Sequence, residues 1–156
     1  MTYSRRQFLH HATASGCCVI AACAGLLTPE QVFAEWVEDN FAPGKLEQTL
    51  DRLFAGADIA DSSAISLDLP LIAEDGAVVP IKVASTLSDI ESIAILVEKN
   101  PVPLAAIFTL SENTEPFVSA QLKMAETCDV IAVIKAGDKL YSARQQVKVT
   151  IGGCGG

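Results

Sequence analysis

The sequence predicts an all-β fold: an immunoglobulin-like β-sandwich of about seven strands, preceded by a short N-terminal amphipathic helix. Short apolar segments recur at regular spacing, turn formers such as Asn100-Pro101 and Gly137-Asp138 separate them, and only one earlier segment has a helical period. About seven short strands in about a hundred residues are typical of such a sandwich. The buried tryptophan and disulfide of antibody domains are missing, since Trp36 precedes the helix, so the prediction depends on strand count and spacing.

The helical segment is expected between Gly44 and Ala57. Its apolar residues recur every three or four positions, which places them on one face of a helix. We expect that face to pack on the domain. The residues concerned are Leu46, Leu50, Leu53 and Phe54.

Beyond the helix the apolar period changes to two, which is typical of strands with one buried face. Glu74-Asp75-Gly76 has the composition of a hairpin turn, and Pro80 inside the following segment predicts an edge or bulged strand. The expected strands cover residues 65–69, 78–83, 93–97, 104–110, 117–124, 130–134 and 140–151.

The N-terminus has the order of features found in an export signal. Arg5 and Arg6 lie in Ser4-Arg5-Arg6-Gln7-Phe8-Leu9, the pattern of a twin-arginine signal, and a weakly apolar stretch and the small residues of Val32-Phe33-Ala34 follow. We therefore expect a signal peptide over 1–34, a sandwich domain over 35–151, an arm over 152–156, and a periplasmic location without a stable membrane anchor. Ile20-Ala21-Ala22-Cys23 leaves lipidation of Cys23 open as an alternative.

Charge and residue types exclude several classes of function. The formal net charge of −8 argues against nucleic acid or an anionic membrane as a partner. Of the five cysteines, only Cys128 and Cys154 follow the predicted signal, and no histidine follows His11. We expect no histidine-based metal site and no catalytic Cys–His or Ser–His pair in the chain itself, since no histidine remains after cleavage.

The chemistry is expected at the C-terminal arm. The last predicted strand alternates through Val147, Val149 and Ile151 and runs directly into Gly152, Gly153, Cys154, Gly155 and Gly156. Glycines without side chains leave the thiol sterically bare, and three extended residues reach about 10 Å. No cationic residue flanks Cys154, so its pKa is expected near the free value of about 8.5, which suits a carrier better than an enzyme nucleophile.

Four alternatives remain open from the residues. Cys154 and Cys128 could form a working thiol–disulfide redox pair, which requires Cα atoms within about 7 Å. Gly155-Gly156 could form a thiocarboxylate, but that chemistry needs ATP, which a twin-arginine signal argues against. The domain could be a passive binding sandwich, or the Gly-rich end an incidental tail.

Three segments resemble the SoxY family of thiosulfate-oxidation carrier subunits: residues 70–81, residues 98–103, and above all Val147 to Gly156 with its terminal Gly-Gly-Cys-Gly-Gly. The resemblance covers nearly the whole mature chain. It implies an immunoglobulin-like sandwich, a heterodimer with a SoxZ-like subunit, and sulfur intermediates attached covalently to Cys154. It also implies transient docking to a c-type haem enzyme that conjugates thiosulfate, a manganese sulfate thiohydrolase and a molybdenum–haem sulfane dehydrogenase. The carrier itself would hold no cofactor.

Overall fold

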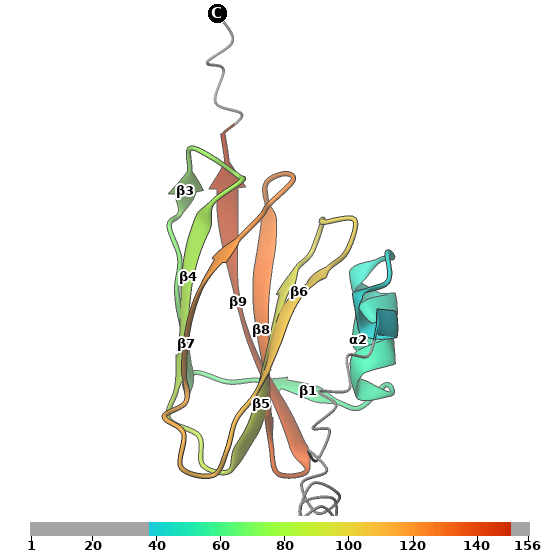
Figure 1. Ribbon diagram of the computed structural model, residues 1–156, viewed down its shortest axis with the longest axis vertical. Helices are drawn as coiled ribbons and strands as arrows, with labels where there is room; N and C mark the ends of the chain where they lie inside the picture. The colour runs from blue at the N-terminus through green and yellow to red at the C-terminus, as the bar shows by residue number, and fades with distance from the viewer. Residues whose placement is uncertain (1–37, 151–156) are drawn as a thin grey trace, which may run out of the picture. The chain divides into compact units, whose positions relative to one another are not determined.

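A computed structural model describes residues 38–150 of the chain. A 3₁₀ helix, η1 (Glu38–Phe41), and a helix, α2 (Leu46–Phe54), precede the strands (Figure 1). The strands in this part of the chain are β1 (Ile59–Asp61), β2 (Ile65–Asp68), β3 (Ile72–Ala73), β4 (Val79–Ser85), β5 (Ile90–Val97), β6 (Leu104–Thr109), β7 (Phe117–Leu122), β8 (Cys128–Ala136) and β9 (Lys139–Val149).

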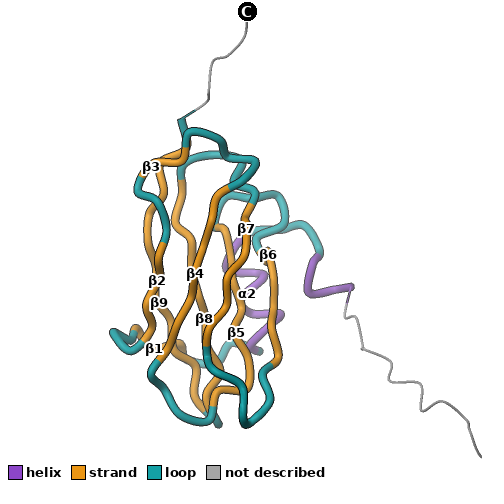
Figure 2. Tube along the Cα trace, turned by 60° about the vertical axis from the view of Figure 1, so that its left-hand side comes forward, coloured by secondary structure: helices purple, strands orange, loops and turns teal. Residues whose placement is uncertain are grey.

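The strands form two sheets that pack face to face (Figure 2). The larger sheet has the order β1-β9-β8-β5-β6, with β3 also paired to β9, and the smaller sheet has the order β2-β4-β7. All seven predicted strands are present, as β2 and β4 to β9, and the predicted sandwich is confirmed. The short strands β1 and β3 were not predicted, and both pair parallel with β9.

The main core lies between the sheets. Alternate residues of β4 point into it, so Val79, Ile81 and Val83 are buried while Pro80 and Lys82 are exposed. This is the period of two that the sequence shows. The core also includes Ile93, Ile95, Val118, Leu122, Val130, Ala132, Ile134 and Val147.

A second apolar cluster lies on the outer face of the larger sheet, where α2 packs. Leu46, Leu50, Leu53 and Phe54 of the helix contact this cluster, as predicted. Because β5 has the core on one face and this cluster on the other, residues 93–97 are buried without interruption. In Figure 1, α2 lies beside the larger sheet, on the side away from β4 and β7.

Three details of the predicted elements were wrong. The helix is shorter than predicted, because Ala55 and Gly56 take positive φ angles of 51° and 73°, which end it. Glu74-Asp75-Gly76 does not join a hairpin: β4 pairs with β2 and β7, whereas β3 crosses to β9. Pro80 lies on a central strand, but β2 pairs with β4 only from Lys82 to Ser85, so Pro80 has a paired strand on one side alone.

Candidate functional site

The predicted site residues lie outside the described part of the chain. Gly152, Gly153, Cys154, Gly155 and Gly156 follow its last residue, Thr150, and Arg5 and Arg6 precede its first. What the structure describes is the arm root, which we define as Lys148, Val149 and Thr150. The root lies at one end of the sandwich, where β9 ends next to β3 (Figure 1).

On one side the root is held by β3. The backbone N–H of Lys148 donates to the carbonyl of Leu71 over 2.9 Å, and that of Thr150 donates to the carbonyl of Ala73 over 3.0 Å. The Thr150 hydroxyl donates to the same Ala73 carbonyl over 3.3 Å. These hydrogen bonds continue the larger sheet to the last described residue, Thr150. Ala73, which accepts two of them, is buried.

On the other side the root is held by a side chain. The β8–β9 ladder ends at the pair Cys128–Val147. Beyond it, the hydroxyl oxygen of Thr127 accepts from the Val149 N–H over 2.9 Å and donates to the Val149 carbonyl over 3.3 Å. The Thr127 side chain therefore bonds both backbone groups of Val149, as a neighbouring strand would, and holds β9 for one residue beyond the ladder.

Replacing Thr127 with valine keeps the shape of the side chain but removes both hydrogen bonds. We expect a loss of about 1–3 kcal/mol in the free energy of unfolding, since the Val149 N–H loses its partner. Chemical denaturation measures that loss, and amide exchange should become faster at Val149. Thr127→Ser keeps the hydroxyl and should exchange like the wild type. Unchanged exchange in Thr127→Val would contradict the role assigned to this hydroxyl.

The turn between β3 and β4 packs against the root. Gly76 accepts a hydrogen bond from the Met124 N–H over 2.7 Å. A Cβ atom at Gly76 would lie 2.4 Å from the Met124 carbonyl oxygen and 2.9 Å from a methyl carbon of Val149. Only glycine fits there without displacement of backbone. The turn, the segment after β7 and the end of β9 thus form one close contact.

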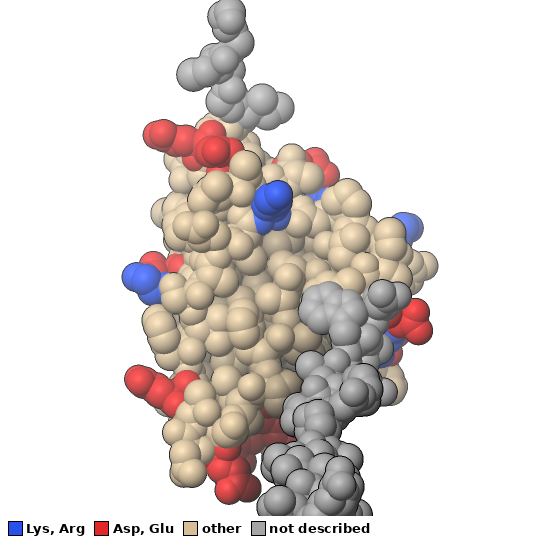
Figure 3. All heavy atoms as spheres, in the orientation of Figure 1, with Lys and Arg blue, Asp and Glu red and all other residues tan. Residues whose placement is uncertain are grey.

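Charged side chains surround the root at the surface. Glu74 and Asp75 of the turn are exposed, and so is Lys148. An ion pair between Lys99 and Glu126, 4.0 Å apart, lies on neighbouring loops and is also exposed. In the view of Figure 3, acidic side chains gather toward the two ends of the sandwich, and the surface between them is largely uncharged.

Cys128, the other cysteine after the predicted signal, is buried at the start of β8 with 2% exposure. Burial raises the pKa of its thiol above the ordinary value; a backbone hydrogen bond with Lys99 opposes this rise in part, and the nearby carboxylate of Glu98 adds to it. A buried neutral thiol is unreactive. The expectation that Cys128 is a buried strand residue is confirmed, and its position gives no support to the redox-pair alternative.

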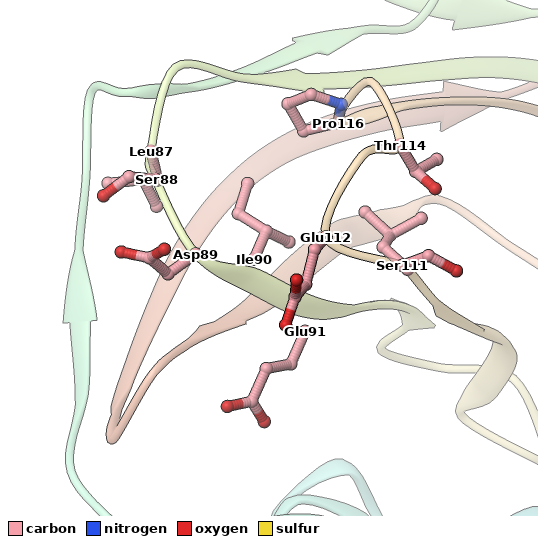
Figure 4. Close-up of a pocket in the computed structure, with 10 residues that line it drawn as sticks. Leu87, Ser88, Asp89, Ile90, Glu91, Ser111, Glu112, Thr114 and Pro116 are labelled. Carbon is pink, nitrogen blue, oxygen red and sulfur yellow. The ribbon is translucent and has the colours of Figure 1, made fainter.

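The structure contains a hollow at the end of the sandwich opposite the root (Figure 4). This cavity of about 510 Å³ lies between the loop that precedes β5 and the loop that joins β6 to β7. Its carboxylates include Asp89, Glu112 and Glu91, of which Glu91 pairs with Lys135 at 2.6 Å. No cluster of potential metal ligands occurs in residues 38–150, and none of the helices described there is long and apolar enough to cross a membrane.

The residues that hold the root were not predicted from the sequence. Thr127, Ala73 and Gly76 are distant from Cys154 along the chain, and their contacts with β9 depend on the folded sandwich. The signal that could have indicated Gly76 is the Asp75-Gly76 pair, but it was interpreted as a hairpin turn.

Comparison with known proteins identifies a family. A family model described as "Sulfur oxidation protein SoxY" matches residues 50–154. The solved structure of the sulfur carrier protein SoxY from Chlorobium limicola f thiosulfatophilum is 38% identical, with a TM-score of 0.63 over 69% of this chain and 97% of that one. A superoxide reductase (neelaredoxin) from Ignicoccus hospitalis is 16% identical, with a TM-score of 0.52 over 59% of this chain and 95% of that one, a likeness of fold alone. No curated protein matches the sequence.

Proposed function

Because the chain belongs to the SoxY family of sulfur oxidation proteins, we propose that it is a sulfur carrier that holds thiosulfate-derived intermediates on Cys154. The carrier presents them to the enzymes of a thiosulfate-oxidising system and performs no catalysis itself. The observation that carries this proposal is the match to the family, which extends through Cys154, together with a root of β9 held up to Thr150 by β3 and Thr127.

The proposed chemistry requires only two things of the chain: a thiol, and an arm long enough to carry that thiol into a partner's active site. Thiosulfate joins the Cys154 sulfur through a new S–S bond as the thiol proton is released to solvent and two electrons pass to a haem enzyme. Hydrolysis of the outer sulfonate with one water then releases sulfate and two protons, and a persulfide anion remains on the cysteine. Neither step needs an acid or base from the carrier. The residues around the root accordingly serve to fix where the arm begins.

The working unit is proposed to be a heterodimer with a SoxZ-like subunit in the periplasm. The haem enzyme, a manganese sulfate thiohydrolase and a sulfane dehydrogenase would dock transiently. A rigid root supports this arrangement, because an arm of about 10 Å can enter a partner's channel only if its start is fixed on the carrier. Cys128 takes no part, since its thiol is buried and its pKa is raised.

Intact-mass analysis of the protein from thiosulfate-grown cells should show sulfur-containing adducts. Peptide mapping should assign all of them to Cys154, because Cys128 is shielded from solvent and mostly protonated near neutral pH. Unfolding the protein before alkylation provides the control, since Cys128 must then react. A carrier without adducts in actively oxidising cells, or one with adducts on Cys128, would contradict the proposal.

Export by the twin-arginine route is tested by replacing Arg5 and Arg6 together with lysine. We expect the carrier to stay in the cytoplasm, and a SoxZ-like subunit without its own signal to stay with it, because this route moves folded proteins. Immunoblots of periplasmic and cytoplasmic fractions measure both. The single variant Arg52→Lys, in α2, is the matched control and should be exported. A partner found in the periplasm without the carrier would refute shared export.

A further inference from the structure

Exposed apolar side chains are concentrated where the arm begins. Among residues 38–150, five large hydrophobic side chains are exposed. The three with the largest exposed fractions all lie between positions 71 and 78, the segment that contains β3 and the turn packed against the root. They are Leu71 at 73%, Ile72 at 57% and Val78 at 50%. Exposed apolar side chains gathered in one place indicate an interaction site.

Two of these side chains belong to the strand pairing that holds the root. The carbonyl of Leu71 accepts the hydrogen bond from the Lys148 N–H, and Ile72 lies directly opposite Lys148 in the β3–β9 register. Paired residues of neighbouring strands have their side chains on the same side of the sheet, so the side chain of Ile72 lies beside that of Lys148. The pairing therefore fixes Leu71 and Ile72 next to the start of the arm.

The third side chain, that of Val78, follows the turn that packs on the root. Gly76 of that turn lies so close to Val149 that a Cβ atom there would be 2.9 Å from a methyl carbon of Val149. The backbone N–H of Val78 donates to the carbonyl of Asp75 over 3.4 Å, which keeps Val78 at the same turn. Figure 1 shows the β3–β4 connection beside the end of β9. We define the root rim as Leu71, Ile72 and Val78.

Charged side chains of both signs accompany the root rim. Glu74 and Asp75 of the turn are exposed, and so are Lys148 of β9 and Lys123 in the segment after β7. Apolar side chains with polar and charged ones beside them are the usual composition of a protein interface. Because both signs are present, we expect the apolar contact to supply most of the affinity at this end of the sandwich.

The length of chain between the root and the thiol determines which protein meets the root rim. Cys154 follows Thr150 by four residues, so their Cα atoms lie at most about 14 Å apart in any conformation. Thr150 is itself held by two hydrogen bonds to the carbonyl of Ala73. An enzyme that takes the Cys154 sulfur into a channel must therefore bring the mouth of that channel to the root, where it meets the root rim.

We propose that the root rim is the docking surface for the haem enzyme that loads thiosulfate onto the carrier, through an apolar contact at the mouth of its channel. This inference rests on the proposed function, in which Cys154 is the loaded thiol. The root rim lies on the sandwich, so its contacts with the enzyme are the same before and during formation of the S–S bond. A contact of equal strength in the ground state and the transition state lowers KM and leaves kcat unchanged.

The test is steady-state conjugation by the haem enzyme, with thiosulfate and an electron acceptor in excess. The varied substrate is the full-length mature carrier in complex with its SoxZ-like subunit. Leu71→Asp should raise KM for the carrier by about tenfold or more, because it buries an unpaired carboxylate against the enzyme. The value of kcat should stay within about twofold of the wild type, since the arm and its thiol are unchanged.

A second variant and a control accompany Leu71→Asp. Ile72→Ser removes apolar area without adding a charge and should raise KM by about fivefold. Ile107→Asp is the matched control, since Ile107 is 40% exposed but lies on β6, and its KM should stay within about twofold of the wild type. Amide exchange at Lys148 and Thr150 should not change in the two root-rim variants, because backbone carbonyls accept the hydrogen bonds there.

The outcomes separate this inference from the proposed function. If Leu71→Asp and Ile72→Ser keep the wild-type KM, the root rim is not the docking surface and the carrier function stands. A lower kcat at unchanged KM would also overturn the inference, since these side chains would then act on the arm rather than bind the enzyme. If the wild type is not conjugated at all, the proposed function fails. If Leu71→Asp instead releases the SoxZ-like subunit or splits a homodimer in size-exclusion chromatography, that protein covers the root rim and the inference is wrong.

Discussion

Replacing Cys154 with serine is expected to abolish both the sulfur adducts and thiosulfate-dependent respiration. A serine hydroxyl is almost fully protonated at neutral pH and cannot form the S–S bond that holds each intermediate, so no partial activity should remain. Intact-mass analysis and oxygen uptake by cells supplied with thiosulfate measure the two effects. Folding should change by less than about 0.5 kcal/mol, because the hydrogen bonds that define the sandwich lie within residues 38–150.

Cys128→Ala is the matched control for this experiment. It removes the other thiol that follows the predicted signal, and it should cost about 1 kcal/mol of stability because a buried sulfur atom is lost from the core. Adducts and respiration should both persist. If Cys154→Ser retained adducts, or if Cys128→Ala lost them, Cys128 would be the reacting thiol or its essential partner, and the redox-pair alternative would replace the carrier.

Replacing Gly76 with alanine is expected to cause the largest loss of stability among single methyl additions outside the core. The new Cβ would lie 2.4 Å from the Met124 carbonyl oxygen, and that atom belongs to backbone that cannot rotate away. We expect a loss of about 2–3 kcal/mol in the free energy of unfolding. For a domain of this size the melting temperature should fall by about 10 °C. The root should loosen too, because the same Cβ would press on Val149.

Gly44→Ala is the control for the cost of adding a methyl group. Its nearest neighbours are the amide oxygen of Gln48 at 3.1 Å and a guanidinium nitrogen of Arg52 at 3.7 Å, both at the ends of flexible side chains. Its stability should stay within about 0.5 kcal/mol of the wild type. Amide exchange distinguishes the two variants, since only Gly76→Ala should speed exchange at Val149 and Thr150. Equal melting temperatures for Gly76→Ala and the wild type would show that the turn does not pack against β9 as described.

The strands could be predicted because their signal is local. In β4, apolar residues alternate with polar ones, and the buried set is the one that the alternation predicts. In β5, five apolar residues follow one another, and the structure shows why: the core and the helix cluster bury both faces. The face of α2 that packs on the sheet was likewise evident from the spacing of its apolar residues. In each case the pattern repeats within one helix or strand, so residues close together in the sequence are enough to predict which side chains are buried.

The turn after β3 could not be assigned correctly from composition. Glu74-Asp75-Gly76 contains good turn formers, and Asp75 does accept a hydrogen bond from the Ala77 N–H over 2.8 Å. Turn chemistry, however, does not specify which strand each flanking segment joins. β3 pairs with β9, more than seventy residues further along the chain. Since β1 pairs with β9 only from Leu140 to Ser142, the backbone groups near the end of β9 are left for β3 to pair with.

Local residue patterns were therefore sufficient for the strand segments and the buried face of the helix, since periodicity is a property of neighbours in sequence. The choice of Cys154 as the reactive residue also came from a local pattern, the bare Gly-Gly-Cys-Gly-Gly segment, and it stays a prediction. The folded chain alone decided how β9 is held at its end and which sheet face α2 covers. Those features join residues as distant as Leu71 and Lys148, or Thr127 and Val149. Such contacts depend on the packing of two sheets, and no short stretch of sequence encodes them.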